Sequence, residues 1–205
     1  VEPTADLGTS LFSAFLVSSN RTGNITSFVI PFSTTSSVTS FQEAFQGHRI
    51  TSFPLIDTSS ANNLQNAWYS NNQLATFPLI DTSNVNDMSG AWRASAITTF
   101  PNLDTSSCSN FNSTWAASPN LTSFPALNFS SALNVSYAWS SCSSLGAFPA
   151  LDLSQVTDMS YGWYNSGITS FAVSTNVNST LNASGAWAYC YSLSSFPRLE
   201  QLDHA

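Results

Sequence analysis

Eight times along this chain an Ile or Leu is followed, three residues later, by a Phe, and successive Phe residues lie 23 to 25 positions apart. The pairs are Ile25/Phe28, Ile50/Phe53, Leu74/Phe77, Ile97/Phe100, Leu121/Phe124, Leu145/Phe148, Ile168/Phe171 and Leu193/Phe196. A fixed period in this range is typical of repeat proteins, in which each repeat makes one turn of a coil and contacts only its neighbours. The period therefore restricts the fold much more than it restricts the function.

A Trp follows the Phe by fifteen positions in five repeats and by sixteen in a sixth, and a small residue comes directly before most of these Trp residues. They are Trp68, Trp92, Trp115, Trp139, Trp163 and Trp187. A position that stays large and apolar in every repeat is expected to point inward, so we predict a core of stacked aromatic rings. The alternative is that the Trp row forms a stacking platform for sugars or bases.

Pro follows the Phe in six of the eight repeats, and Ser, Asn and Thr fill much of the rest. Because Pro cannot donate to a β-ladder, each repeat is predicted to hold one short strand, such as 122–124, that ends at the Phe. The Ser-, Asn- and Thr-rich remainder favours turns and single helical turns. The predicted fold is a repeat solenoid of about eight turns with short parallel strands. Its predicted parts are an N-terminal cap at 1–24, the solenoid at 25–199 and a C-terminal end at 200–205.

An acidic or amide residue follows five predicted strands in succession, at Asp57, Asp81, Asp104, Asn128 and Asp152, before the row breaks at Thr175 and resumes at Glu200. In an Asp-Thr-Ser segment the Asp can accept the backbone N–H two residues on, which forms an Asx turn. Stacked carboxylates could instead bind divalent cations, but one carboxylate per repeat is few ligands for calcium. We predict turn capping, with Asp57, Asp81, Asp104 and Asp152 as weak candidates for a metal row. A second such row, which precedes each Trp by five residues, is predicted to be an Asn ladder that satisfies backbone groups.

Charge and cysteine usage narrow the function classes. Charged residues make up 7% of the chain, Lys is absent and the net charge is -7, so we expect neither nucleic acid nor an anionic membrane as a partner. No apolar stretch is long enough to span a bilayer. Cys142 and Cys190 share a repeat position two repeats apart, or about 10 Å, which is too far for a disulfide. We predict that they and Cys108 are buried free thiols.

The segment 25–45, with its Ile-Pro and its Ala-Phe ending, resembles the BspA-like bacterial surface leucine-rich repeat. Later repeats such as 74–92, with Asp-Thr-Ser and a buried aromatic that is followed by a Cys at Cys142 and Cys190, resemble the related surface-lipoprotein repeat. The resemblance implies a leucine-rich-repeat-like right-handed coil with short parallel strands on one face. It also implies extracellular display for adhesion or recognition, on bacteria or on viruses that infect microbes. The family motif is a packing motif, so no catalytic residue follows from it.

Catalytic signals are weak, and we predict that the chain is not an enzyme and uses no cofactor. The two histidines, His48 and His204, lie in no metal-ligand or phosphate-loop pattern. The binding surface of a repeat protein is built from positions that do not repeat. The residues after each Trp vary most, and they include aromatic and Arg side chains of the kind that anchor interfaces. The candidate ligand-binding residues are Tyr69, Arg93, Tyr164, Tyr189 and Tyr191.

These observations lead to a predicted function with two alternatives. The favoured prediction is an extracellular recognition or adhesion module, displayed on a microbial cell or a virion, that binds a cell-surface glycan or protein. The second is a structural repeat of a fibre or filament that self-associates, such as a viral fibre. The third is an ice-binding solenoid, suggested by Thr and Ser pairs such as Thr98/Thr99 and Thr122/Ser123.

Overall fold

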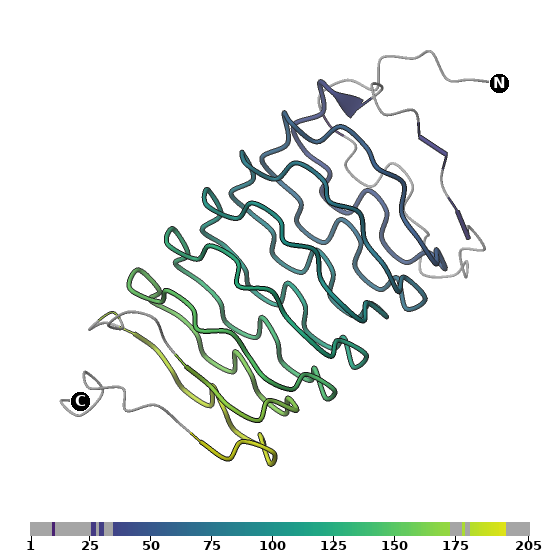
Figure 1. Ribbon diagram of the computed structural model, residues 1–205. Coiled ribbons are helices and arrows are strands. Elements are labelled where there is room, and N and C mark those ends of the chain that lie inside the picture. The colour runs from purple at the N-terminus through teal and green to yellow at the C-terminus, as the bar shows by residue number, and fades with distance from the viewer. Residues whose placement is uncertain are drawn as a thin grey trace.

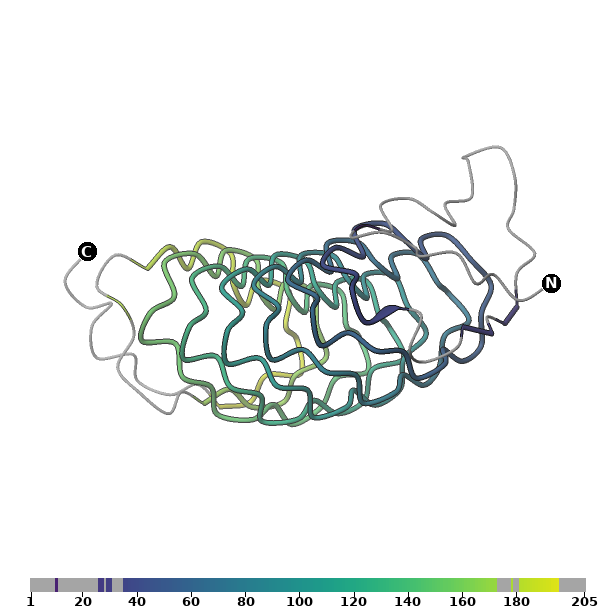
Figure 2. The ribbon, with the colours of Figure 1, turned by 90° about the horizontal axis from the view of Figure 1, so that it is seen from above.

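The chain winds into an elongated stack of similar loops, which is shown by a computed structural model (Figures 1 and 2). The structure describes Ser10 and residues 26–27, 29–30, 35–172, 178 and 181–195. Parallel bridges link Ser40, Asn63, Asp87, Asn110, Asn134, Asp158 and Asn182 in sequence, so the chain returns to one position at each of them. We call each circuit a rung. Rungs 1 to 5 are residues 40–62, 63–86, 87–109, 110–133 and 134–157, rung 6 begins at 158 and rung 7 begins at 182.

The predicted fold class is wrong. A leucine-rich-repeat-like solenoid needs short parallel strands and short helical segments, but the described residues contain no α-helix and no β-strand. Rungs are joined by isolated parallel bridges and by hydrogen bonds between otherwise irregular segments. The predicted strand 122–124 is reduced to one bridged residue, Ser123, which pairs with Thr99. Pro125 follows this strand position and has no N–H, so the pairing cannot extend past Phe124.

The backbone around each Trp does not form the predicted helical turn, because two of its positions have a left-handed conformation. Residues two before and two after the Trp have φ angles of 52–62°. Those before are Asn66, Gly90, Ser113, Tyr137, Tyr161 and Gly185, and those after are Ser70, Ala94, Ala117, Ser141, Asn165 and Tyr189. In rung 2 the N–H groups of Asn66 and Trp68 donate to rung 3, whereas that of Ala67 donates back to Leu64. The left-handed residues turn every second N–H toward the next rung, which prevents a helix from forming.

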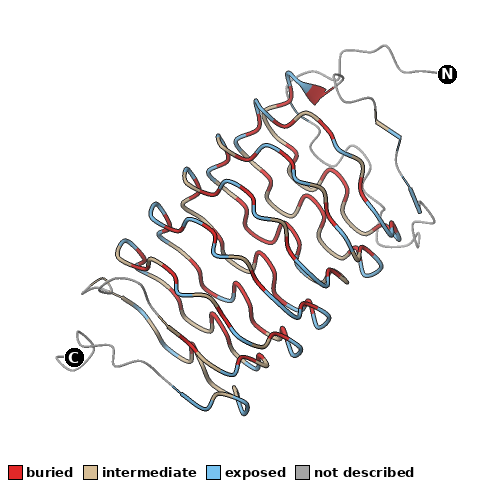
Figure 3. Ribbon diagram, in the orientation of Figure 1, coloured by how far each residue is buried: buried red, intermediate tan, exposed pale blue. Residues whose placement is uncertain are grey.

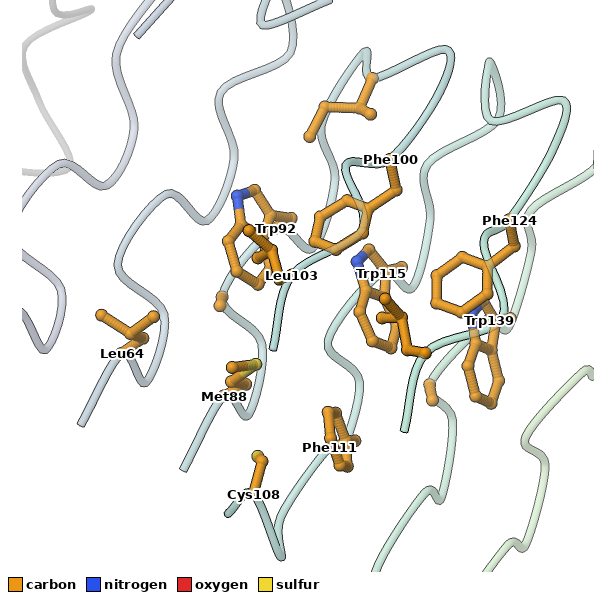
Figure 4. Packing of buried hydrophobic residues seen from close by; sticks show 14 of the residues in the cluster. Leu64, Met88, Trp92, Phe100, Leu103, Cys108, Phe111, Trp115, Phe124 and Trp139 are labelled. Carbon is orange, nitrogen blue, oxygen red and sulfur yellow. The ribbon is translucent and has the colours of Figure 1, made fainter. Parts of the chain in front are cut away.

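The core is a double row of aromatic rings, as the repeat predicts. Trp139 stacks on Trp115 and Trp163 at centroid distances of 5.3 and 4.9 Å, and Phe124 and Phe148 meet it edge-on. The same arrangement runs through rungs 2 to 6, and Figure 4 shows it around Trp115. Buried positions recur at the same places in successive rungs (Figure 3). Trp68, Trp92, Trp115, Trp139 and Trp163 are buried and Trp187 in rung 7 is half-buried, so the prediction of a Trp core is confirmed and a solvent-facing Trp platform is excluded for rungs 2 to 6.

Short polar side chains satisfy the backbone between these apolar rows. The second Asn/Asp row is not an inter-rung ladder, because each side-chain oxygen accepts the N–H two residues on, as Asn63 does from Gln65 at 2.8 Å. Asn110 additionally donates to Asp87 of the preceding rung at 3.2 Å. Buried Thr residues supply further links, since the Thr58 hydroxyl donates to the carbonyl of Asp81 in the next rung. These contacts give partners to backbone groups that no strand pairs, which a strandless stack requires.

The predicted domain boundaries at 24 and 200 fall outside the described residues, as do Phe28 and Phe196 of the repeat. Within the described part, no helix has the length and apolar character to cross a membrane.

Candidate functional site

The predicted acidic row caps turns. Asp57 accepts the backbone N–H of Ser59 at 3.0 Å and its hydroxyl at 2.7 Å, and Asp104 accepts the same pair from Ser106. The Ser hydroxyl, followed by the Ser N–H, holds the pKa of each carboxyl below its ordinary value. Matching N–H bonds occur at Asp81, Asn128 and Asp152, so the predicted Asx turns are confirmed. No group of three or more His, Cys, Asp or Glu side chains gathers as a metal site among the described residues.

The thiols are structural. All three are free, as predicted, and the predicted burial is confirmed for Cys108 and Cys142, whereas Cys190 is only half-buried. The Cys142 thiol donates to the carbonyl of Trp115 at 3.2 Å, and the Cys190 thiol donates to that of Trp163 at 2.8 Å. Each thiol therefore satisfies the Trp carbonyl of the preceding rung, which is a packing role.

Burial raises the pKa of the Cys108 and Cys142 thiols from 9.0 to about 12. The folded state then keeps a proton that the unfolded state loses, so stability is intact below about pH 9 and falls toward pH 12. The expected slope is about 1.4 kcal/mol per pH unit for each thiol. Cys142→Ser removes one of the two thiols, so the free energy of unfolding should fall less steeply with pH by the contribution of one thiol. Denaturant unfolding at pH 8 to 11 measures this. Ser118 already donates from the equivalent position to Trp92, so the fold tolerates this change. If the free energy of unfolding fell equally steeply with pH in the wild type and the variant, the raised pKa of Cys142 would be contradicted.

The candidate binding residues fall into two groups. Tyr69 and Arg93 occupy the same position in rungs 2 and 3, where the Arg93 guanidinium lies 5.5 Å from the centre of the Tyr69 ring. Tyr164 lies three rungs beyond Arg93, or about 15 Å at the usual spacing between paired chains. The structure therefore brings Tyr69 and Arg93 together, but it places them apart from the other three candidates.

Those three candidates belong to a larger group, which we call the tyrosine cluster: Tyr137, Tyr161, Tyr164, Tyr189 and Tyr191. The rings form a connected path, with Tyr137 stacked on Tyr161 at 5.0 Å and each later contact edge-on. Tyr161 meets Tyr164 at 5.6 Å, Tyr164 meets Tyr189 at 5.2 Å, and Tyr189 meets Tyr191 at 6.1 Å. Tyr137, Tyr189 and Tyr191 are 41, 55 and 86% exposed. The cluster is a continuous aromatic surface over rungs 5 to 7.

The backbone of the Trp segment positions this cluster. Tyr137 and Tyr161 stand at the left-handed position two before the Trp, with φ of 56 and 55°. Gly185 takes that position in rung 7, and a Cβ there would lie 2.6 Å from the Tyr161 ring. The Gly thus leaves room for the Tyr161 ring to lie over the next rung. A bulky non-Gly residue at positive φ is strained, and such strain persists only where surrounding structure holds it.

Tyr137 and Tyr161 were missed by the sequence analysis, which considered only the residues after each Trp. The position two before the Trp also varies within the chain, and this variation was the available signal. It holds Asn66, Gly90, Ser113, Tyr137, Tyr161 and Gly185.

The surroundings of the tyrosine cluster are almost uncharged. In the described parts of rungs 5 to 7, the charged side chains are Asp152 and Asp158, and each accepts a backbone N–H in its own turn. His48 is buried in rung 1 and His204 lies outside the described residues, so no described histidine is exposed. The site thus offers aromatic faces, phenol hydroxyls and small polar groups, which suit binding better than acid–base or nucleophilic chemistry.

Comparison of the chain with protein-family models, with curated proteins and with solved structures finds no match in any of the three.

Proposed function

We propose that this chain is a non-catalytic extracellular recognition module that binds a cell-surface glycan or protein through the tyrosine cluster. The single observation that supports this proposal most is the connected path of Tyr rings over rungs 5 to 7, of which Tyr137, Tyr189 and Tyr191 are exposed. In an adhesion protein of a microbial cell or a virion, this surface would face the target. The predicted resemblance to bacterial surface repeats is consistent with that setting.

The exposure of Tyr137, Tyr189 and Tyr191 supports a binding role over a packing role. The core is already filled by Trp and Phe, so the Tyr side chains are not needed to close it. Tyr has few rotatable bonds and combines a large apolar face with a hydroxyl, so it orders at low entropic cost on binding. Such residues are common among those that contribute most to interface affinity. Tyr rings in edge-on contact also leave faces free for a sugar ring or an apolar side chain.

The test is binding of the purified chain to glycan arrays and to intact target cells. The double variant Tyr164→Ala/Tyr189→Ala is expected to weaken binding by about 30-fold or more, from the loss of two aromatic contacts of about 1 kcal/mol or more each. Circular dichroism should stay unchanged, because neither ring belongs to the core.

Two matched variants locate the effect. Leu79→Ala removes another exposed apolar side chain, one that is 65% exposed in rung 2, and should leave binding unchanged. Tyr69→Ala disrupts the separate pair with Arg93 and should have little effect. Loss of binding in Tyr69→Ala with none in the double variant would move the site to that pair. Unchanged binding in both would refute the proposal.

A further inference from the structure

We propose that the tyrosine cluster binds a neutral glycan, a short chain of uncharged sugar rings that lies over rungs 5 to 7. This ligand class deepens the proposed function and rests on it, because it concerns the same site. The ring faces, the phenol hydroxyls, the neighbouring polar side chains and the lack of charge each support it.

The ring faces of the cluster are only partly covered by one another. Tyr137 and Tyr161 stack with 14° between their planes, whereas the later contacts along the path are edge-on at 66, 79 and 67°. An edge-on contact covers one face of one ring only. The face of an aromatic ring is electronegative, and the C–H groups on one side of a sugar ring carry partial positive charge. The free Tyr faces therefore match the apolar side of a sugar.

The phenol hydroxyls are available to a ligand. In the described part of the chain, no hydrogen bond joins any of the five hydroxyls to another residue. The hydroxyls of Tyr161 and Tyr164, whose side chains are half-buried, still reach solvent. A phenol both donates and accepts, as a sugar hydroxyl does. The cluster thus offers hydrogen bonds beside its ring faces.

Short polar side chains lie beside the rings. Asn165 is exposed directly after Tyr164, and it occupies in rung 6 the left-handed position that Tyr189 holds in rung 7. Its amide makes no hydrogen bond with a described residue. Ser184 is exposed directly before Gly185, over which the Tyr161 ring lies. An amide and a hydroxyl supply further donors and acceptors for the hydroxyl groups of a sugar.

The charge around the cluster excludes acidic sugars. The charged side chains of residues 134–172, all of which are described, are Asp152 and Asp158, and each accepts a backbone N–H in its own turn. The whole chain has no Lys and a net charge of -7. A carboxylated or sulfated glycan over rungs 5 and 6 would meet no cation and would be repelled by these carboxylates. The ligand is therefore neutral.

The extent of the cluster favours a glycan over a protein. Rungs 5 to 7 span about 10 Å at the usual spacing between paired chains, whereas a typical protein interface buries about 800 Å² on each partner. Of the other exposed large apolar side chains in the described rungs, Leu55 and Leu79 lie in rungs 1 and 2 and Leu133 lies in rung 4. Protein partners also gain specificity from complementary charges, which this surface lacks.

The test is equilibrium binding of the 205-residue chain to neutral oligosaccharides of glucose, galactose, mannose or N-acetylhexosamine. Each is compared with a carboxylated or sulfated counterpart. The chain should bind a neutral member at least about tenfold more tightly than its acidic counterpart. Because no ion pair forms, its affinity should change less than about twofold between about 0.05 and 0.5 M NaCl.

Two variants of one residue connect this binding to the cluster. Tyr161→Ala removes the ring at the centre of the path and should weaken binding about tenfold. Ala94 adopts a similar positive φ of 56°, so the backbone accepts Ala at this angle, and circular dichroism checks the fold. Tyr161→Phe is the matched control, because it keeps the ring and should bind within about fivefold of the wild type.

No binding to any neutral oligosaccharide would overturn the proposal, and so would tighter binding of the acidic counterparts or equal binding by Tyr161→Ala. Intact cells separate this failure from that of the proposed function. Periodate destroys the vicinal diols of cell-surface sugars, and protease removes surface proteins. Cell binding that survives periodate, is lost after protease and still needs Tyr164 and Tyr189 would identify a protein ligand and leave the proposed function standing.

Discussion

Replacing Trp139 by Ala is expected to lower the free energy of unfolding by about 3–5 kcal/mol. Trp139 is fully buried and packs between Trp115 and Trp163, with Phe124 and Phe148 edge-on. Ala would leave a cavity that rungs 4, 5 and 6 cannot close, because hydrogen bonds between neighbouring rungs hold their spacing. Urea unfolding, followed by circular dichroism, measures the loss.

The control is Trp139→Phe. Phe45 holds the equivalent position in rung 1, where its ring stacks on Trp68 at 5.8 Å. A Phe in rung 5 keeps an aromatic face against both neighbours, so it should cost less than half as much as Ala. Equal costs for the two variants would show that ring stacking along this row contributes little to stability.

Gly167→Ala is expected to destabilise the fold by about 3 kcal/mol, although it adds one methyl group. The new Cβ would collide with the carbonyl of Ser143, and it would lie 2.9 Å from that carbonyl's carbon and 3.1 Å from the Leu145 oxygen. These are backbone atoms, so no side chain can rotate away. The N–H of Gly167 donates to Cys142 at 3.1 Å and holds the two rungs at this distance.

Gly146→Ala is the matched control for this effect. The nearest atom to a Cβ at Gly146 is the Thr122 oxygen at 3.9 Å, which is ordinary contact. The free energy of unfolding of this variant should lie within about 0.5 kcal/mol of that of the wild type. If both Gly variants had the same stability, the close approach at Gly167 would be disproved.

The tyrosine cluster was predicted only in part. Tyr164, Tyr189 and Tyr191 were found because they follow a Trp, but their contact with each other depends on which rungs are adjacent and on the left-handed backbone. Tyr137 and Tyr161 come from the other side of the Trp, and the structure adds them to the same surface. Tyr69 and Arg93 were grouped with them in sequence but are separated from them in space. One repeat position recurs in every rung along the stack, so two residues that share it can lie several rungs apart.

The sequence by itself determined the parts of the molecule that depend on side-chain chemistry and on period. The spacing of Phe and Trp predicts which side chains form the core, and the Asp-Thr-Ser segments predict the Asx turns, because both follow from local reach and burial. The tertiary structure alone decided that bridges replace strands and that alternate N–H groups point along the stack. Those features depend on hydrogen bonds between residues more than 20 positions apart, and no local propensity encodes their direction.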